Sequence, residues 1–600
     1  MSIVKIIQSN LTAAETNFIN AELALVLQAA AKHNIQFIET GLILHSNASS
    51  PLLPDERSFA EYAEDFRKAQ SYTIENCDGK ILISGGGYPG GLYGFYSWLR
   101  QTTGVQWNNV NDDEISFGPI VPESAASMPK VAFRGMNGLY PDTERPFFIK
   151  MLRWMARNQW NCTMIHVWRW EGAENCEELI ELAHLCAVEL NIGGHAMNNF
   201  IAESLFETHP EYFGMRYGER RLSSKISMPD MPNKFSQGPL QPCFSNPEAV
   251  NYIAKNIAEY IGKHPEIKVF ALWPHDGVNN WCQCPECKKI TPFDQVRRLA
   301  DAVLKLSPRP VYLELLAYCS LLTLPQEMAD LSRTYTIFCP YLRHYHHRFY
   351  DSGLEPVKNG LGKNYPEADP VCPVDDREYG PLWNDWIKAM RSRNSSANIF
   401  AYYQLLFTDY KEGIDRSRYL RYPAPELVAD ELRRFIADGM QVYYDCSCPY
   451  PAFWPDGRLY SFHSRVLWDP ECDINQLISA QSAVMLGVAA GLIDRITSDL
   501  DHGVRDFSKK LLDEFDALNL QLPEKNIARL RLWIEYTVLA SGAETARRRQ
   551  DYHLQYELEQ KIIQLFNDNT ALLDGAAAAD RLAKFAQNCC KHALDSNVPA

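Results

Sequence analysis

The sequence predicts a (β/α)8 barrel of the TIM type, preceded by a small α/β domain and followed by an all-helical region. Between residues 131 and 445, eight short apolar segments alternate with amphipathic segments of helical period, the pattern of a closed parallel sheet surrounded by helices. Residues 1–125 hold strands and helices without this regularity, and the chain after residue 473 has helical periodicity alone. The expected domains are therefore residues 1–125, 126–470 and 471–600.

The eight expected barrel strands are short and mainly apolar, and helical patterns fall between them. An open doubly wound sheet is the alternative arrangement for the same pattern. The predicted strands are residues 131–135, 162–167, 190–194, 268–273, 310–316, 335–339, 397–402 and 440–445.

The N-terminal region contains three expected strands, at residues 3–7, 35–44 and 80–84. The last one leads into glycines spaced as G-x-G-x-x-G, at Gly85, Gly87 and Gly90. A dinucleotide site also needs an acidic residue at the end of a second strand about 20 residues later, and the sequence offers none. Because Pro89 also lies inside this loop, we interpret the glycines as a tight structural turn.

Charge and composition narrow the classes of partner. The net charge is -15 with no block of lysine and arginine, which argues against nucleic acid or an anionic membrane as a ligand. The first residues lack the basic and apolar regions of a signal peptide, and no apolar run reaches the roughly 18 residues of a membrane helix. We therefore expect a cytoplasmic protein whose 16 cysteines are mostly free thiols.

Polar and aromatic residues stand where the predicted strands end. The fourth strand runs directly into His275-Asp276, and the ends of barrel strands carry catalytic groups in barrel enzymes. A carboxylate there can stabilise a developing positive charge, and a capping aspartate is the structural alternative. The other predicted strand ends also carry polar and aromatic residues, and aromatic faces pack against sugar rings. Together they suggest a polar ligand bound at one mouth of the barrel. The predicted ligand-binding residues are Arg134, His166, Trp168, His195, Trp273, His275, Tyr318, Arg343 and Tyr403.

Two further carboxylates are candidates for catalysis beside Asp276. Asp445 ends the eighth predicted strand, and Glu314 lies inside the fifth between leucines. Burial would raise the pKa of Glu314 into the range of a general acid. The alternative for Glu314 is a side chain that faces the outer helices and pairs with a lysine or arginine.

A cysteine cluster, Cys282-x-Cys284-x-x-Cys287, follows the His275-Asp276 loop. Three closely spaced thiolates can bind zinc, but a structural zinc site needs four ligands and the sequence shows no obvious fourth. Zinc binding, packed thiols and a disulfide all stay open. We expect the cluster to support the loop of Asp276 without a part in the chemistry, and we expect no other cofactor.

These motifs resemble the family called domain of unknown function 4838, which is related to glycoside hydrolase families 20 and 67 and includes the endo-β-N-acetylglucosaminidases of family 163. The resemblance extends from about residue 81 to residue 473. The motifs that carry it include Phe133-Arg-Gly135, Gly193-Gly-His195, Cys243-Phe-Ser-Asn-Pro247, His275-Asp276 with Trp281-Cys-Gln-Cys284-Pro-Glu-Cys287, and Leu467-Trp-Asp-Pro470. The resemblance implies the barrel, the preceding α/β domain and a helical end.

The chain departs from these families at the site. Family 20 enzymes have an Asp-Glu pair at the end of strand four, whereas Gly277 follows Asp276 here. Relatives in the unknown-function family tend to carry Asn where this chain has His275, and Glu where it has Asp445. The resemblance therefore implies a charge-stabilising role for Asp276 and leaves the proton donor unassigned.

Three functions are compatible with these residues. The first is a glycoside hydrolase with Asp276 and either Asp445 or Glu314 across the scissile bond. The second is a barrel that binds a saccharide without cleaving it, and the third is a metal-dependent hydrolase that uses the cysteine cluster. A hexosaminide would suit an aromatic acetamide pocket of Trp273, Tyr318 or Tyr403, and a uronide would need a guanidinium from Arg134, Arg169 or Arg343.

Overall fold

The computed structural model describes most of the chain. The described residues are 4–35, 37, 40–47, 52–122, 128–222, 239–277, 280–340, 348–351, 376–403, 424–446, 457–501 and 507–573.

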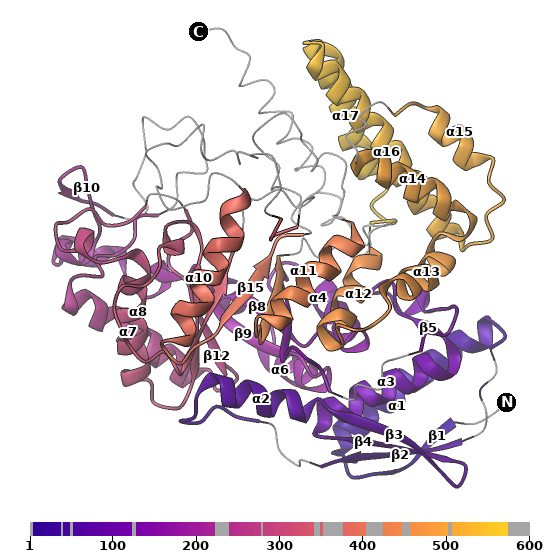
Figure 1. Ribbon diagram of the computed structural model, residues 1–600, viewed down its shortest axis with the longest axis horizontal. Coiled ribbons are helices and arrows are strands. Elements are labelled where there is room, and N and C mark those ends of the chain that lie inside the picture. Colours follow the sequence, from indigo (N-terminus) through magenta and orange to yellow (C-terminus); the bar gives the residue numbers. More distant parts are fainter. Residues whose placement is uncertain are drawn as a thin grey trace.

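Eight parallel strands form a closed barrel, which confirms the predicted fold class (Figure 1). The ring is completed by β16, whose residues Val442 to Cys446 pair with Phe133 to Asn137 of β7. This pairing rules out the open doubly wound sheet. The strands are β7 (Phe133–Asn137), β8 (Cys162–His166), β9 (Glu189–Gly194), β12 (Val269–Leu272), β13 (Tyr312–Ala317), β14 (Thr334–Phe338), β15 (Ala397–Ala401) and β16 (Val442–Cys446).

Helices cover the outside of the barrel and follow strands along the chain. Polar caps fix where two of them begin: the Asn246 side chain accepts from the backbone N–H groups of Glu248 and Ala249, and Thr291 caps the next helix in the same way. Proline at the first helical position supports both starts. The barrel helices include α4 (Arg145–Arg157), α6 (Cys176–Leu185), α7 (Pro247–Lys263), α8 (Pro292–Leu306), α10 (Tyr379–Arg391), α11 (Pro425–Ala437) and α12 (Gly457–Trp468).

The N-terminal region is a four-stranded sheet with helices, which confirms its predicted α/β class. The strand order is β1-β2-β4-β3, in which β1, β2 and β4 are parallel and β3 is antiparallel to β4. The sequence analysis missed β3 and the helix α2. The elements are β1 (Val4–Ser9), α1 (Ala13–Lys32), β2 (Thr40–Ser46), α2 (Phe59–Ala69), β3 (Tyr72–Cys77), β4 (Lys80–Gly85) and α3 (Tyr88–Thr103).

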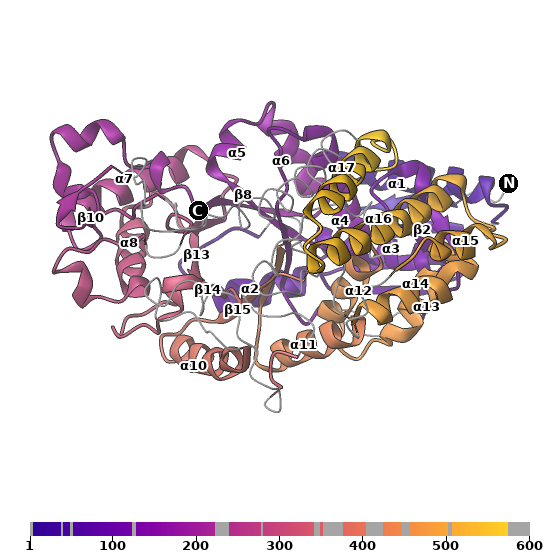
Figure 2. The ribbon, with the colours of Figure 1, turned by 90° about the horizontal axis from the view of Figure 1, so that it is seen from above.

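Helix α2 closes the N-terminal end of the barrel. The Phe59 ring lies 4.2 Å from that of Tyr335 on β14, and the Phe66 ring lies 4.5 Å from that of Phe133 on β7. Figures 1 and 2 show α2 against the barrel. Since this end is filled by aromatic side chains, a ligand has access to the barrel from the opposite end, where the strands finish.

The glycine-rich turn between β4 and α3 is a packing feature, in agreement with its interpretation as a structural turn. A Cβ atom on Gly86 would lie 2.1 Å from the Lys68 carbonyl oxygen, and one on Gly90 would lie 2.0 Å from that of Ser71. Only glycine allows such close approach of two backbones.

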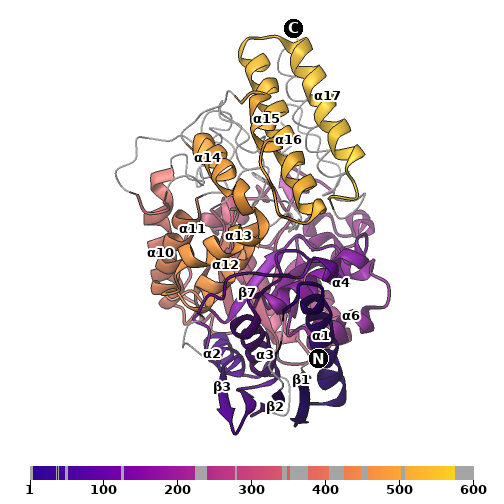
Figure 3. The same cartoon turned by 90° about the vertical axis from the view of Figure 1, so that its right-hand side faces the viewer.

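The C-terminal part is helical, as predicted. From Met485 onward its helices pack around a second core, whereas Ile474 belongs to the core shared by the barrel and the N-terminal sheet. In Figure 3, α16 and α17 stand at the opposite end of the molecule from the N-terminal sheet. These helices are α13 (Ile474–Met485), α14 (Ala490–Asp501), α15 (Lys510–Asp516), α16 (Glu524–Arg548) and α17 (Tyr552–Asp568). The boundaries predicted at residues 125 and 470 stay predictions.

Within the described ranges, no helix is both long and apolar enough to cross a bilayer.

Candidate active site

Four neighbouring strands carry five of the predicted site residues at one side of the barrel mouth. β8, β9, β12 and β13 pair in that order. His166 is the last residue of β8, and His195 directly follows β9. Trp273 and His275 follow β12, and the half-buried Tyr318 follows β13. The strand ends therefore gather residues that lie far apart in sequence.

Aromatic rings line this side of the mouth. The indole of Trp168, on the short helix α5 (Val167–Glu171), stacks on the His166 imidazole with 4.2 Å between ring centroids and 12° between planes. The imidazole of His195 lies 5.9 Å from that of His166 and 5.1 Å from the Trp273 ring. Trp168 is 41% exposed and offers a flat apolar face to a ligand.

Glycine at position 194 is required for the placement of His166. Gly194 has φ +76°, and a Cβ atom there would lie 2.1 Å from Nδ1 of His166. Any other residue at position 194 would displace the His166 imidazole from its place against the end of β9. The Gly193-Gly194 pair is thus a sequence signal for close packing at the mouth.

The loop after β12 is held by a side chain that the sequence analysis did not predict. Gln241 accepts from the His275 backbone N–H at 3.0 Å and donates to the His275 carbonyl at 2.8 Å. Asn280 donates its amide to the Asp276 carbonyl at 3.2 Å, and the Asp276 side chain is exposed. The two hydrogen bonds between Gln241 and the His275 backbone are called the Gln241 clamp below. They fix the backbone that presents the Asp276 carboxylate.

Burial keeps two imidazoles at the site neutral. It lowers the pKa of His166 to about 3 and that of His275 to about 3, and the nearby His195 adds to both shifts. A neutral imidazole has one donor and one acceptor nitrogen, which suits contact with sugar hydroxyls. At neutral pH these two side chains therefore add no positive charge to the mouth.

Replacing His275 by Asn is expected to reduce the acid sensitivity of folding. The folded-state pKa of about 3 is below the unfolded value of about 6.5, so the unfolded chain binds more protons as pH falls. The stability due to neutral His275 is complete above pH 6.5 and is lost between pH 6.5 and 3, by at most about 1.4 kcal/mol per pH unit. Urea unfolding at pH 7 and pH 5 measures this loss. An equal loss in the wild type and in His275→Asn would contradict the assignment.

Glu314 lies beneath the mouth, inside the barrel. Its side chain is 0% exposed, and its two oxygens accept from Nε1 of Trp273 at 2.9 Å and from the Tyr335 hydroxyl at 2.6 Å. Burial raises the pKa of Glu314 to about 7, as predicted for a buried carboxyl group. Both carboxyl oxygens are thus engaged by side chains of the barrel interior, and none of the Glu314 surface is exposed. The hydrogen bond from Trp273 lets Glu314 hold this indole in place, and the role of Glu314 as a catalytic acid stays a prediction.

Asp445 points away from the mouth, which corrects the second carboxylate prediction. Tyr444 hydrogen-bonds Asn191 across the barrel interior, so the next residue of β16 faces outward. The Asp445 carboxylate lies 3.4 Å from Nδ1 of His463 on α12, and both side chains are fully buried. Burial raises the pKa of Asp445 and His463 opposes that shift.

Arg134 and Tyr403 also lie outside the mouth. Arg134 is 0% exposed near the N-terminal end of β7, and its guanidinium donates to the carbonyls of Val131 and Gln159 and to the Gln70 side chain. The Tyr403 hydroxyl donates to Glu431 on α11 within the helix layer. Neither side chain is available to a ligand, in contrast to the prediction. Arg343 lies outside the described residues.

The cysteine cluster has a fourth member. Cys243 lies beside Cys282, Cys284 and Cys287, and all four sulfur atoms are within 4.8 Å of one another. Every cysteine in the described part of the chain is a free thiol. Cys243 is 39 residues before the C-x-C-x-x-C motif, which is why spacing alone did not connect them.

The chain forms a closed parallel barrel with polar and aromatic side chains at its strand ends. Barrel enzymes have their active sites in this position. Residues 121–363 match the model of the family described as "Domain of unknown function (DUF4838)", which confirms the resemblance over these residues. No curated protein matches the sequence.

Several solved structures resemble the chain in their overall backbone arrangement. An enzyme of family GH138, described as targeting pectin rhamnogalacturonan II, is 12% identical with a TM-score of 0.48, over 95% of this chain and 74% of that one. The structure of CpGH84B is 10% identical with a TM-score of 0.41, over 96% of each chain. A β-N-acetylhexosaminidase from Bacteroides fragilis is 11% identical with a TM-score of 0.42, over 82% of this chain and 92% of that one. Likenesses at this level carry no information on substrate or catalytic residues.

Proposed function

We propose that this chain is a glycoside hydrolase that acts on a hexosaminide or a uronide-containing saccharide at the barrel mouth. The observation that carries the proposal is the exposed Asp276 carboxylate, on a loop held by the Gln241 clamp, at the same mouth as the aromatic rings of Trp168, His166 and His195. A carboxylate on a held backbone, at the same mouth as an apolar platform, suits a sugar ring that develops positive charge. The resemblance to the unknown-function family and its glycoside hydrolase relatives implies the same chemistry.

In this proposal Asp276 stabilises the oxocarbenium-like transition state or orients the acetamide of a hexosamine. The aromatic faces bind the sugar ring in the ground state. The cysteine cluster is given no chemical step, because a metal held by four protein sulfur atoms would have no open position for a substrate.

A hexosaminide is the favoured substrate class. A uronate needs a guanidinium partner, and two of the three predicted arginines are engaged elsewhere. Arg134 is fully buried away from the mouth, and Arg169 pairs with Asp142 at 2.9 Å and lies 4.5 Å from the Tyr140 ring. The aromatic residues near Asp276, Trp273 above all, are those expected of an acetamide pocket.

The test is hydrolysis by the full-length chain of aryl glycosides of N-acetylglucosamine and of glucuronic acid, with sugar binding followed in parallel. Release of the aryl alcohol from the N-acetylglucosaminide is the expected result. Release from the glucuronide alone would contradict the preference for a hexosaminide and retain the hydrolase.

The second candidate function is a barrel that binds a saccharide without cleaving it. One observation favours it: of the three carboxylates predicted to be catalytic, Asp276 alone lies at the mouth, since Glu314 and Asp445 point elsewhere. Binding of either sugar without hydrolysis in the same assay would support this second function.

Trp168→Ala is expected to weaken saccharide binding by roughly two- to twelvefold, because an aromatic contact contributes about 0.5–1.5 kcal/mol beyond its buried area. Isothermal titration with N-acetylglucosamine oligomers measures the change. Tyr556→Ala, which removes an exposed ring on α17, is the matched control and should leave binding unaltered. Equal affinities for Trp168→Ala and the wild type would remove Trp168 from the binding surface.

A further inference from the structure

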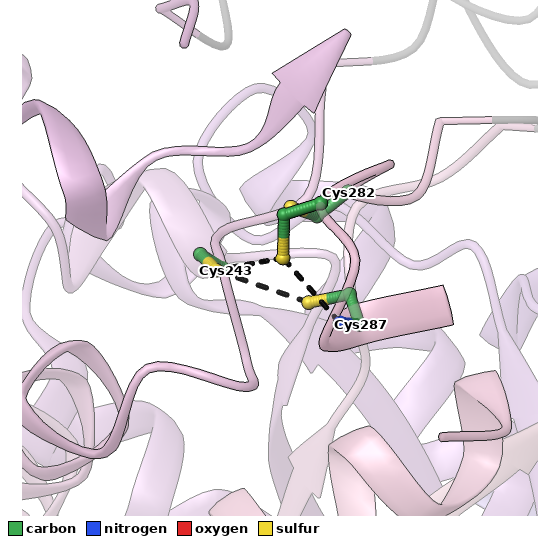
Figure 4. Close-up of side chains that lie close together, drawn as sticks. Cys243, Cys282 and Cys287 are labelled. Carbon is green, nitrogen blue, oxygen red and sulfur yellow. Dashed lines mark hydrogen bonds between the residues drawn. The ribbon is translucent and has the colours of Figure 1, made fainter. Parts of the chain in front are cut away.

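Four buried cysteines converge on one point beside the barrel mouth. Cys243 stands just before α7, and Cys282, Cys284 and Cys287 lie in the loop after β12 that leads to α8. Their side chains are between 1% and 4% exposed. Figure 4 shows the sulfur atoms of Cys243, Cys282 and Cys287 directed toward one another. Ordinary packing of thiols does not require four sulfur atoms to face a common centre.

The distances from the Cys243 sulfur atom to those of Cys284 and Cys287 match a tetrahedral metal site. Zn–S bonds of about 2.3 Å in a tetrahedron place the sulfur atoms about 3.8 Å apart. Sγ of Cys243 lies 3.7 Å from that of Cys284 and 3.8 Å from that of Cys287. A disulfide would need a separation of about 2 Å.

Hydrogen-bond donors surround the sulfur atoms as they do around thiolates. The Met215 backbone N–H donates to Cys282 at 3.2 Å, and that of Cys287 donates to Cys284 at 3.4 Å. The Arg220 guanidinium lies 3.7 Å from the Cys282 sulfur atom. Four thiolates around one divalent cation carry two net negative charges, and this arginine and the amide dipoles offset them.

We propose that Cys243, Cys282, Cys284 and Cys287 bind one Zn²⁺ ion as a closed structural site. Four sulfur ligands are typical of structural zinc sites, and catalytic zinc keeps a position open for water or substrate. The site therefore stabilises the fold and takes no part in bond cleavage.

The zinc site fixes the loop that presents Asp276. Gln241, which forms the clamp on His275, is two residues before Cys243 in the chain. Met215, which contacts Cys282, belongs to the hairpin β10 (Met215–Arg216) and β11 (Glu219–Arg220). One ion thus joins the segment before α7, this hairpin and the loop after β12. Loss of the metal should loosen the Gln241 clamp along with the cluster.

Elemental analysis of the full-length chain, purified under reducing conditions, is the first test. The expected content is one zinc per chain. Replacement by Co²⁺ should give the sulfur-to-cobalt charge-transfer absorption and the intense d–d bands of a tetrahedral thiolate site. A chain without stoichiometric metal that also fails to develop these bands with Co²⁺ would overturn the proposal, as would a disulfide among the four cysteines found by mass spectrometry after alkylation.

A matched pair of variants assigns the metal to this cluster. Cys284→Ser is expected to lose most of the bound zinc and to unfold at a lower temperature, because zinc binding contributes directly to folding. Cys186→Ser removes a buried cysteine outside the cluster and should keep one zinc per chain. Where Cys284→Ser does not fold, thiol modification of the wild type in the presence of a chromogenic chelator gives the readout. Zinc retained after all four thiols are modified would contradict the site. These readouts are independent of glycoside hydrolysis, so the proposed function can fail while the zinc site holds.

Discussion

Asp276→Asn is expected to lower kcat for an aryl N-acetylglucosaminide by about 10² to 10³, the usual effect of removing one electrostatic contact to a transition state. Asparagine keeps the shape of the side chain and removes its charge. Because Gln241 holds the His275 backbone and Asn280 donates to the Asp276 carbonyl, the loop should keep its conformation in the variant.

KM should change much less than kcat, because the ground-state contacts from Trp168 and the imidazoles are intact. Initial rates over a range of substrate concentrations separate the two effects. Asp385→Asn, on the exposed surface of α10, is the control and should leave both constants unchanged. A rise in KM with an unchanged kcat would make Asp276 a ground-state binding residue.

Arg134→Met is expected to lower the free energy of unfolding by about 3 kcal/mol or more, with little effect on the activity of the folded fraction. The variant leaves the buried carbonyl oxygens of Val131 and Gln159 without this donor, and each buried unsatisfied acceptor costs about 1–3 kcal/mol. The Gln70 side-chain oxygen keeps its hydrogen bond from Asn161. Methionine fills much of the same volume, so the cavity contribution is small.

Urea unfolding followed by tryptophan fluorescence measures this loss. Arg531→Met is the matched control: its ion pair with Asp516 is on the surface, where such pairs contribute at most about 1 kcal/mol. If Arg134→Met keeps wild-type stability and loses saccharide binding, the original prediction of Arg134 as a ligand-binding residue is restored.

The fold was predictable because apolar strand segments and amphipathic helical segments alternate regularly along the sequence. All eight predicted barrel segments correspond to observed strands, with boundaries that differ by a few residues. That small difference explains the error at Arg134. The first strand was predicted at residues 131–135, which made Arg134 its end, whereas β7 runs from Phe133 to Asn137 and places Arg134 near its start.

The direction of side chains on the strands was not predictable in the same way. Because parallel barrel strands are buried on both faces, their sequences do not alternate between polar and apolar residues, and nothing distinguishes the inner face from the outer one. Glu314 on β13 and Asp445 on β16 are both buried carboxyl groups. One points inward to Trp273 and the other outward to His463.

Contacts across long stretches of sequence were missed for a different reason. Cys243 and Gln241 act on a loop more than 30 residues later in the chain, and no local pattern connects them to it. Cys243 belonged to a motif of the family resemblance, but nothing in the sequence linked its thiol to the later cysteines. The fold brings the segment before α7 against the loop after β12, and this juxtaposition depends on tertiary structure.

The most direct test of the central claim, that the mouth of this barrel cleaves a glycosidic bond, is hydrolysis of an aryl N-acetylglucosaminide by the wild type and by Asp276→Asn in the same assay. The account predicts turnover by the wild type and a loss of about 10² to 10³ in kcat in the variant, with binding of the sugar retained. A wild type that binds the sugar and releases no aryl alcohol from either glycoside, or a variant with full kcat, would contradict it.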